Sequence, residues 1–418
     1  MQQAKRKGKY SAIIGCTLML TMVYMSLTSW SVAVNELASS LSLSPIMVQA
    51  GASVLVGGYA IGSFVEGKMC AKIGWRKTFT YVIIPFIIAS ALIPVVTNYY
   101  IILLLRFIQG WGCMVSTTVA IITSWLPVKE RGLALGIMLG AIGLGSALGG
   151  YIGGILTPIL GWRYTFWVIT ALTIVGVITF YALVKEAPPL EEENIPAVSN
   201  SDGKEINIHK EPGLWILGIA TLGSFFACYG MYAYLAQYLY TLNYSAGQVG
   251  LVVMFNGLIA VVASVVCGRL SDNLVSKIGA QKSRSYVCAW GGMFVTFVGC
   301  IILPHVSPLG IVPALIVAMV IGWGPPATNG PGMTLPADIF GSAASGPGVG
   351  LVLLVAGIGG VISPVFVPWL ASVTSWNVAW YVTGGAALMG MIMNIVLGNY
   401  KTKAVASKAQ ADRSTSLS

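Results

Sequence analysis

Long apolar stretches separated by short polar turns run through this chain from end to end. The first half contains six stretches without Asp, Glu, Lys or Arg, and the second half contains three, each long enough for two membrane spans. About 20 apolar residues cross the hydrocarbon of a bilayer as a helix. The pattern therefore predicts twelve spans, at residues 10–34, 46–66, 78–97, 100–125, 132–156, 163–184, 213–241, 247–267, 284–303, 309–330, 345–370 and 377–398.

The character of these stretches predicts helices rather than strands. They are rich in Val, Ile, Leu and Gly and lack the polar–apolar alternation of a membrane barrel. A helix also satisfies its own backbone hydrogen bonds in lipid. The predicted fold class is an all-α polytopic membrane protein with twelve transmembrane helices in two six-helix pseudo-repeats. Its predicted parts are an N-terminal bundle (1–184), a cytoplasmic linker (185–213), a C-terminal bundle (214–400) and a cytoplasmic tail (401–418).

Charge is scarce and unevenly placed. Of the 418 residues, 56% are hydrophobic and 9% are charged, which is too little charge to cover a soluble protein of this length. If the spans alternate, all of the 23 Lys and Arg residues except Arg106 and Arg163 fall on one side. Cytoplasmic loops carry such an excess. We therefore expect both termini in the cytoplasm and the chain in the cell membrane, and the net charge of +10 requires no nucleic-acid partner.

Several kinds of chemistry lack a sequence signal. The seven cysteines are scattered without a C-x-x-C pair, and no H-E-x-x-H, G-x-S-x-G or Walker motif occurs. An enzyme, a metal site and a cofactor are therefore not expected. No Asp or Glu lies in the middle of a predicted span, and Glu36 and Glu66 are placed at span ends. A carboxylate relay for protons is not expected either.

Two turns share one pattern of glycines and cations. GKMCAKIGWRKT (67–78) joins predicted spans 2 and 3, and GRLSDNLVSKIGAQKSR (268–284) joins spans 8 and 9. In the first turn the glycines are expected to end one helix and begin the next, while the cations hold helix carbonyls or acidic partners. A duplicated turn suggests two repeats that move as bodies. The predicted conformational latch comprises Gly67, Lys72, Gly74, Arg76, Lys77 and Asp272.

Arg106 is the one strongly basic residue well inside a predicted span, where a charge is unfavourable unless it has a role. Gln109 follows it at helical spacing, and the polar stripe continues through Cys113, Ser116 and Thr123. One hypothesis makes Arg106 the counter-ion of an anionic substrate, with Gln109 beside it. The other has Arg106 bonding backbone carbonyls and polar side chains of spans 1 and 5 without touching substrate.

Three further spans offer polar groups for a substrate cavity. The polar face of span 1 either lines the cavity or makes interhelical hydrogen bonds. Hydroxyl and amide groups of span 7 are suited to a carboxylate, whereas Tyr238 and later tyrosines are expected in the outer aromatic belt. The broken stretch GWGPPATNGPG (322–332) in span 10 marks a binding site or only a helix bend. Besides Arg106 and Gln109, the candidate substrate-binding residues are Tyr24, Thr28, Tyr229, Tyr232, Gln237, Trp323 and Asn329.

Together these features resemble the major facilitator superfamily of secondary transporters. Twelve spans, a central hydrophilic loop and the paired turn are typical of that family, and the resemblance covers nearly the whole chain. Three further motifs agree: RFIQGWG (106–112), GLGSALGGYIGG (143–154) and GWRYTF (161–166). The resemblance implies two bundles that rock around a midplane site. One position departs from the family, because its usual Asp is Ala71 in the first turn, whereas the second turn keeps Asp272.

A narrower resemblance is carried by PADIFG (336–341), SWSVAVNEL (29–37) and Trp323, which are similar to the oxalate/formate antiporter and monocarboxylate transporter branch. The cations that this branch usually places in spans 8 or 11 are missing here. We expect secondary active transport of a small organic anion, foremost a monocarboxylate, by rocker-switch alternating access, driven by a co-transported proton or an exchanged anion. The alternatives are an exporter of hydrophobic or drug-like compounds and a transporter-like solute sensor. Membrane lipids are the other expected partners, and the protein is expected to be a monomer.

Overall fold

A computed structural model describes residues 2–43, 45–187, 210–340 and 344–400, and within these ranges the chain is helical apart from short turns. Residues 188–209, most of the predicted linker, and residues 401–418, the predicted tail, lie outside the described residues. The helices are α1 (Gln2–Val32), α2 (Val34–Ser40), α3 (Pro45–Ile73), α4 (Trp75–Leu92), α5 (Tyr99–Trp111), α6 (Val115–Trp125), α7 (Val128–Leu183), α8 (Pro212–Thr241), α9 (Ala246–Ile278), α10 (Ala280–Tyr286), the π-helix η2 (Val287–Met293), α11 (Phe294–Val306), the 3-10 helix η3 (Ser307–Leu309), α12 (Ile311–Ala327), α13 (Asn329–Phe340), α14 (Ser345–Val373) and α15 (Trp376–Asn399).

These helices correspond to the predicted spans, although some spans consist of several elements. α5 and α6 together form the fourth span and are separated at residues 112–114. α7 contains the fifth and sixth spans, with a bend at Gly161, whose φ of 78° is incompatible with a continuous helix. In the described part of the chain, ten segments are long and apolar enough to cross a membrane. The two remaining predicted spans correspond to α3 and α4.

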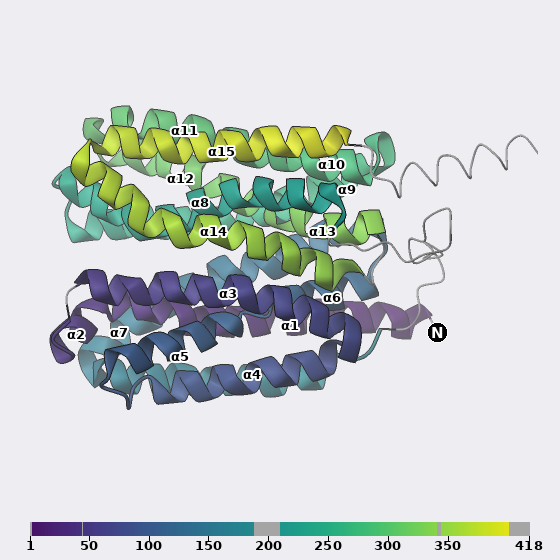
Figure 1. The fold of residues 1–418 in the computed structure, drawn as a ribbon, viewed down its shortest axis with the longest axis horizontal. Coiled ribbons are helices and arrows are strands. Elements are labelled where there is room, and N and C mark those ends of the chain that lie inside the picture. Colours follow the sequence, from purple (N-terminus) through teal and green to yellow (C-terminus); the bar gives the residue numbers. More distant parts are fainter. Residues whose placement is uncertain (1, 44, 188–209, 341–343, 401–418) are drawn as a thin grey trace, which may run out of the picture.

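The helices form two layers that lie against each other (Figure 1). α1 to α7 make one layer and α8 to α15 make the other. The layers meet along two helix pairs, α3 with α14 and α7 with α9. Glycines bring the paired backbones into contact: a Cβ on Gly67 would lie 2.2 Å from the carbonyl oxygen of Gly346, and one on Gly268 would lie 2.3 Å from that of Gly132. The two contacts are equivalent positions of the pseudo-repeat, since Gly67 and Gly268 begin the two copies of the paired turn.

The paired turns also share one backbone conformation. Gly74 has φ 78° and ψ 160°, and Gly279 has φ 81° and ψ 158°. Each residue immediately precedes a helix, α4 or α10, in a region that favours glycine. The prediction that Gly74 begins a helix is confirmed. The prediction that Gly67 ends one is wrong, because α3 continues to Ile73 and Gly67 instead permits the close contact with α14.

One other placement predicted from the sequence is wrong. Tyr238 does not belong to an outer belt, because it is 2% exposed and its hydroxyl shares a hydrogen bond with that of Ser307. The length of an apolar stretch locates a span, but it does not say which helix face is buried. Glu66, predicted at the end of a span, lies within α3, which continues to Ile73, and is 0% exposed.

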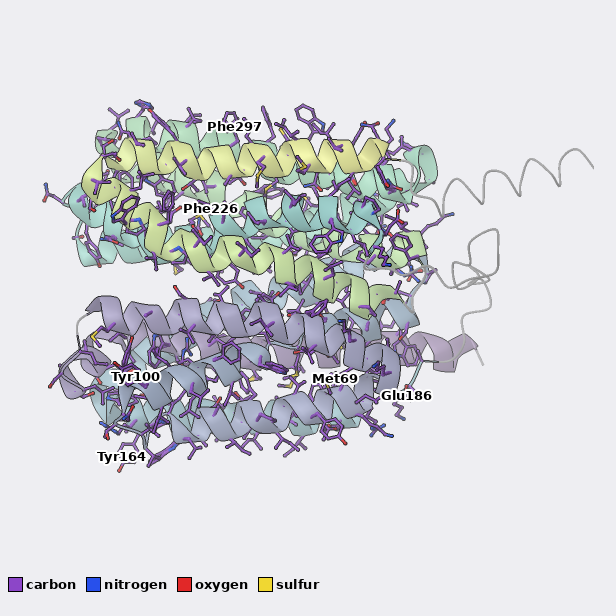
Figure 2. The ribbon with its side chains drawn as sticks, viewed as in Figure 1. Met69, Tyr100, Tyr164, Glu186, Phe226 and Phe297 are labelled. Carbon is purple, nitrogen blue, oxygen red and sulfur yellow. The ribbon has the colours of Figure 1, made fainter. Side chains whose placement is uncertain are left out.

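The outside of both layers is covered by apolar side chains (Figure 2), as in a protein surrounded by lipid rather than water. Tyr100 is 77% exposed and Tyr164 is 61% exposed, and both lie at one end of the bundle, away from Glu186. Exposed tyrosines at one level are typical of a membrane–water interface. We call the opposite end, where α1 begins and the α3–α4 and α9–α10 turns lie, the basic end.

Candidate functional site

Three tyrosines bring the two layers together near the middle of the helices. Tyr24 of α1 shares side-chain hydrogen bonds with Tyr59 of α3 and with Tyr229 of α8. Tyr24 is 6% exposed, Tyr59 is 3% exposed and Tyr229 is half-buried. Phe225 of α8 stacks on Tyr59 with ring centroids 6.1 Å apart. We call Tyr24, Tyr59 and Tyr229 the tyrosine cluster; it joins two of the predicted substrate-binding residues from opposite layers.

The chemistry of the tyrosine cluster suits a small anion with an apolar part. Each phenol hydroxyl both donates and accepts a hydrogen bond, so the cluster can turn donors toward a carboxylate or sulfonate while its rings contact apolar atoms. Tyr59 is a cluster residue that the sequence analysis missed. It follows an apolar run in which no polar periodicity singles it out, and only its contacts with Tyr24 of α1 and Phe225 of α8 reveal it.

The remaining predicted residues of spans 1 and 7 do not join the tyrosine cluster. The Thr28 side chain lies outside the described part of the chain. Tyr232 is 45% exposed, and its hydroxyl pairs with the Cys228 thiol of the same helix. Gln237, which follows Tyr232 by five residues on α8, is exposed. Their roles as substrate contacts remain predictions.

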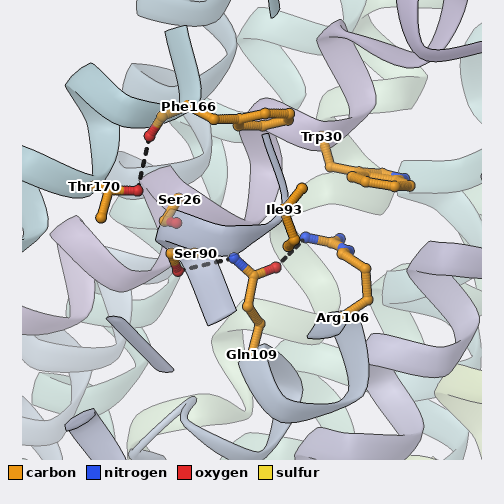
Figure 3. A pocket seen from close by; sticks show the side chains of 8 residues that line it. All are labelled: Ser26, Trp30, Ser90, Ile93, Arg106, Gln109, Phe166 and Thr170. Carbon is orange, nitrogen blue, oxygen red and sulfur yellow. Dashed lines mark hydrogen bonds between the residues drawn. The ribbon is translucent and has the colours of Figure 1, made fainter. Parts of the chain in front are cut away.

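Arg106 lies inside the first layer and not between the layers (Figure 3). Its guanidinium donates to Gln109 Oε1 at 2.8 Å and to the carbonyl oxygen of Leu27 at 3.5 Å, and it lies over the Trp30 ring at 4.6 Å from the centroid. Gln109 in turn donates to Ser90 Oγ at 2.9 Å. Arg106 and Gln109 are each 3% exposed. These contacts agree with the span 1 part of the second sequence hypothesis, since Arg106 bonds a backbone carbonyl there, but its polar side-chain partner is Gln109 of the fourth span rather than a residue of span 5.

A small cavity adjoins this group, and its lining explains the orientation of Arg106. The lining comes from α1, α4, α5 and α7, all in the first layer, and comprises Ser26, Trp30, Ser90, Ile93, Arg106, Gln109, Phe166 and Thr170. Arg106 Nε is buried and has no hydrogen-bond partner among the described atoms. The guanidinium therefore retains one unused donor beside the cavity, while its contacts with Leu27 and Trp30 hold α1 against α5.

The broken stretch of span 10 divides α12 from α13 at Thr328. Trp323 Nε1 donates to the carbonyl oxygen of Gly291 in η2 at 2.9 Å, which ties two helices of the second layer together. Asn329 opens α13, next to Gly330, where a Cβ would lie 2.7 Å from the carbonyl oxygen of Gly132. Asn329 is thus placed at the contact between the layers, whereas Trp323 is placed within one layer.

A buried network of charges joins the layers at the basic end. Asp272 of α9 accepts the backbone N–H groups of Gly132 and Leu133 in α7 at 3.0 and 2.7 Å. Arg284 of α10 pairs with Asp272 at 2.5 Å and donates to the carbonyl oxygen of Val128, again in the first layer. Asp272, a residue of the predicted latch, therefore bonds α9 to both α7 and α10.

Asp338 of α13 completes this network from the same layer as Arg284. It pairs with Arg284 at 3.1 Å and with Arg131 of α7 at 3.1 Å, and all three side chains are 0% exposed. Arg131 also donates to the carbonyl oxygens of Leu126 and Thr123. We call Asp272, Arg284, Asp338 and Arg131 the latch network. Removal of one partner from a buried ion pair destabilises a protein by about 3–5 kcal/mol, so intact pairs favour the arrangement in which the two layers meet at the basic end.

The first copy of the turn makes no comparable network in the described residues. Lys72, Arg76 and Lys77 are exposed, and Arg76 lies over the Tyr181 ring of its own layer at 5.8 Å. Ala71 stands where the second copy has Asp272, so the acceptor is missing. Of the charged residues predicted for the latch, only Asp272 takes part in the latch network. From the sequence, the cations Arg131 and Arg284 count only toward membrane orientation, and the acid Asp338 only toward the PADIFG motif.

The fourth span breaks where it passes the tyrosine cluster. α5 ends at Trp111, and Met114 adopts a left-handed conformation, with φ 57°, before α6 begins at Val115. Such a conformation is uncommon for a residue with a side chain and is retained where surrounding structure requires it. Thr117, in the first turn of α6, donates its hydroxyl to Glu66 Oε2 at 3.1 Å. A buried carboxyl therefore faces the start of this half-helix.

Comparison with known proteins gives a consistent picture. Residues 16–329 match the family model described as Major Facilitator Superfamily. The chain is 24% identical over 401 residues to a protein of Cupriavidus necator named as a probable sulfoacetate transporter, covering 91% of each chain. It is 23% identical over 204 residues to the hexuronate transporter of Bacillus subtilis, covering 48% of each.

Solved structures show the same fold. The proton:xylose symporter XylE aligns with a TM-score of 0.72 at 15% identity, covering 97% of this chain and 99% of the symporter. The human organic anion transporter MFSD10 aligns with a TM-score of 0.67 at 14% identity, covering 93% and 99% of the two chains. At these identities the likeness concerns the arrangement of the helices.

Proposed function

The chain belongs to the major facilitator superfamily of secondary transporters, and we propose that it carries a small organic anion across the cytoplasmic membrane by alternating access. The observation that carries the proposal is the tyrosine cluster, which places hydroxyl groups from both layers at one point. Full-length similarity to a protein named as a sulfoacetate transporter supports the anionic class. A monocarboxylate is the finer assignment, since the cluster consists of hydroxyl groups and offers no cation to balance a second negative charge.

In this proposal the two layers are rigid bundles, residues 1–184 and 214–400, that rock about the tyrosine cluster. The basic end faces the cytoplasm, as the excess of cations there suggests. The latch network and the glycine contacts close that side. Tyr24 and Tyr229 belong to opposite bundles, so an anion that bridges them interacts with both bundles while either side closes. The monomer is the transporting unit.

Arg106 serves this cycle as a positioning residue of the first bundle. It fixes α1, which carries Tyr24, against α5 through the Leu27 carbonyl and the Trp30 ring. A direct ion pair with substrate is the competing role. The two roles differ in how they respond to a conservative substitution, because lysine keeps the charge but loses the planar fork that spans several partners.

Uptake into proteoliposomes tests both the class of substrate and the role of Arg106. We expect accumulation of at least one of sulfoacetate, glucuronate, lactate, formate or oxalate by the wild-type protein. Arg106→Gln and Arg106→Lys are expected to lower uptake to a similar extent, with a lower thermal stability in both, because both lose the bonds to Gln109 and Leu27. Rescue by lysine alone would show that Arg106 pairs with the anion, and no flux of any anion would refute the proposed function.

Export of cationic or drug-like compounds is the second candidate, and one observation favours it. Glu66 is a buried carboxyl in the first bundle, whereas the sequence analysis had placed no carboxylate inside the membrane. Energised efflux of a lipophilic cation such as ethidium, abolished by Glu66→Gln in the absence of any anion transport, would select this function over the first.

A further inference from the structure

Glu66 is a buried titratable group to which the proposed cycle assigns no role. It lies in α3 and is 0% exposed. Oε2 accepts the Thr117 hydroxyl at 3.1 Å, while Oε1 is buried and has no hydrogen-bond partner among the described atoms. The backbone amides of Met114 and Thr117, at the start of α6, face the carboxyl. One oxygen of the carboxyl is therefore left without a donor in an apolar interior.

The groups around Glu66 supply no positive charge. Tyr59 and Cys70 face it from α3, and Cys113 and Thr117 face it from the broken fourth span. α14, which covers this site, contains no ionisable side chain along its whole length. In the described part of the chain, every ion pair involves other carboxylates. An unpaired negative charge is strongly disfavoured when it leaves water, so this carboxyl needs a proton or a cation.

The second bundle seals the site from the basic end. A Cβ on Gly67 would lie 2.2 Å from the carbonyl oxygen of Gly346, and one on Gly350 would lie 2.5 Å from that of Ser63. These contacts bracket Glu66 along α3. Water can reach the carboxyl from the cytoplasm only when the start of α14 moves away from α3, which is the motion that opens this side in the proposed cycle.

We propose that Glu66 is a proton-binding site, protonated while α3 and α14 are in contact and deprotonated into cytoplasmic water when they separate. The inference rests on the alternating access proposed above and adds the coupling ion. In the step, the carboxyl O–H bond breaks, the proton passes to water, and the carboxylate that remains is hydrated and stabilised by Thr117 and the start of α6. A metal cation fits poorly, because the neighbours offer thiols and one hydroxyl rather than a shell of oxygens.

Glu66 and the tyrosine cluster are arranged for such coupling. Tyr59 and Glu66 are seven residues apart on α3, so they lie about two turns apart on one face. Cys113, between α5 and α6, lies near both Tyr24 and Glu66. Substrate bound at the tyrosine cluster and a proton bound at Glu66 therefore both contact α3, and the break between α5 and α6 lies beside each site.

Infrared spectroscopy of the full-length protein in phosphatidylcholine bilayers tests the proton site without any substrate. The difference spectrum between pH 6 and pH 9 is expected to contain the carbonyl stretch of a protonated carboxyl that is lost at high pH. The band should be absent in Glu66→Gln and shifted in Glu66→Asp. Glu36→Gln is the matched control and should keep it, since Glu36 accepts the Trp162 backbone N–H far from this site. Identical spectra of the wild type and Glu66→Gln would overturn the proposal.

The coupling to opening is measured at Cys70, which lies on the same seam. A Cβ on Gly346 would lie 3.3 Å from Cys70 Cβ, so separation of α14 from α3 exposes the thiol. The rate of alkylation by N-ethylmaleimide, read by peptide mass spectrometry, is compared between the wild type and Glu66→Gln at each pH. Each rate is divided by the thiolate fraction of Cys70 measured in the same protein, because loss of the Glu66 charge also changes the titration of this thiol. The ratio of the wild-type rate to the Glu66→Gln rate is expected to rise with pH. The rise is at most about tenfold per pH unit when one proton is released. A flat ratio would refute the coupling.

Neither measurement uses an anion, so their outcome is independent of the proposed substrate. Absent anion uptake with a positive infrared and alkylation result would refute the substrate class and leave the proton site standing. Normal anion uptake together with identical infrared spectra of the wild type and Glu66→Gln would refute the proton site and leave the substrate class standing.

Discussion

At the scale of single residues, the tyrosine cluster is the feature on which substrate recognition depends. Its members come from three helices and two bundles, and each contributes a hydroxyl to a site with little water. Hydrogen bonds to a charged group contribute about 1.5–3 kcal/mol. Loss of one hydroxyl should therefore weaken binding of an anion without removing the apolar contacts of the ring.

The first prediction concerns these hydroxyls. Tyr24→Phe and Tyr229→Phe should each weaken anion binding by roughly 10- to 100-fold, because about 1.4 kcal/mol corresponds to a factor of ten. Binding is measured by the ligand-induced rise in unfolding temperature of the purified protein. Tyr234→Phe is the control, since Tyr234 lies on the same helix as Tyr229 but shares its hydrogen bond with Thr383 at 2.7 Å. An equal loss of anion binding in Tyr234→Phe would show that the hydroxyls of the tyrosine cluster have no specific role in binding.

Single residues were also the scale at which sequence reasoning was least complete. Tyr24 and Tyr229 were identified because polar groups recurred at helical spacing or gathered in one span. Tyr59 and Glu66 were not, since each is a single polar residue in an apolar run and its significance depends on which helix covers it. For the same reason, the sequence does not decide whether Arg106 pairs with substrate or bonds neighbouring helices. It shows an intramembrane charge but not the Leu27 carbonyl or the Trp30 ring that face it.

At the scale of helices, glycines determine how closely the two bundles approach. The pairs α3–α14 and α7–α9 have backbone contacts at equivalent positions, Gly67 with Gly346 and Gly268 with Gly132. Small residues at such contacts are what membrane helices use to pack without a hydrophobic driving force. The same contacts that close the basic end must separate for substrate to leave, so they set the balance between closed and open conformations.

The second prediction follows from the geometry at Gly67. Gly67→Ala should favour the open conformation, because the new Cβ would lie 2.2 Å from the Gly346 carbonyl oxygen and must push α14 away. Overpacking of this kind disfavours the closed conformation by about 1–3 kcal/mol. Alkylation of Cys70 should therefore accelerate. Gly257→Ala on α9 is the matched control, since no atom lies within 4 Å of its Cβ, and it should leave the rate unchanged.

The elements themselves were largely predictable, and the exceptions have physical reasons. Apolar length and turn residues locate each span, and Gly74 was recognisable as the residue between two helices. The break between α5 and α6 was not, because Met114 carries no sequence signal for its left-handed conformation. The extent of α3 was underestimated because its last two turns are amphipathic and carry Lys68 and Lys72, which a hydropathy pattern assigns to a loop.

At the scale of the whole molecule, the latch network joins the two bundles through buried ion pairs and hydrogen bonds at the basic end. Arg131 and Asp338 are separated by 207 positions in the chain, and no spacing rule connects them. The sequence therefore predicts two bundles and a latch that includes Asp272, but it does not identify Arg131, Arg284 and Asp338 as the partners of Asp272. Partners that meet across an interface between repeats depend on how the repeats dock, and that information is absent from local patterns.

The third prediction is that Asp338→Asn opens the basic end. The substitution removes the carboxylate that Arg131 and Arg284 share, although Arg284 keeps its pair with Asp272. Loss of one partner of a buried ion pair disfavours the closed conformation by about 3–5 kcal/mol. A change of that size shifts a two-state population by roughly two to four powers of ten. Glu130→Gln is the control, since Glu130 pairs with Lys9 at the exposed surface of the same end, where an ion pair contributes little.

Distances between spin labels at the two ends of the bundle test the central account most directly. One pair replaces Lys72 and Lys277 by cysteine at the basic end, and the other replaces Tyr100 and Leu309 at the opposite end; Cys70 and Cys228 become serine, because the other native cysteines are buried. On introduction of Asp338→Asn, the account predicts a longer distance for the first pair together with a shorter distance for the second. If both distances stay constant, or both lengthen together, the two bundles do not rock about a shared site and the account is contradicted.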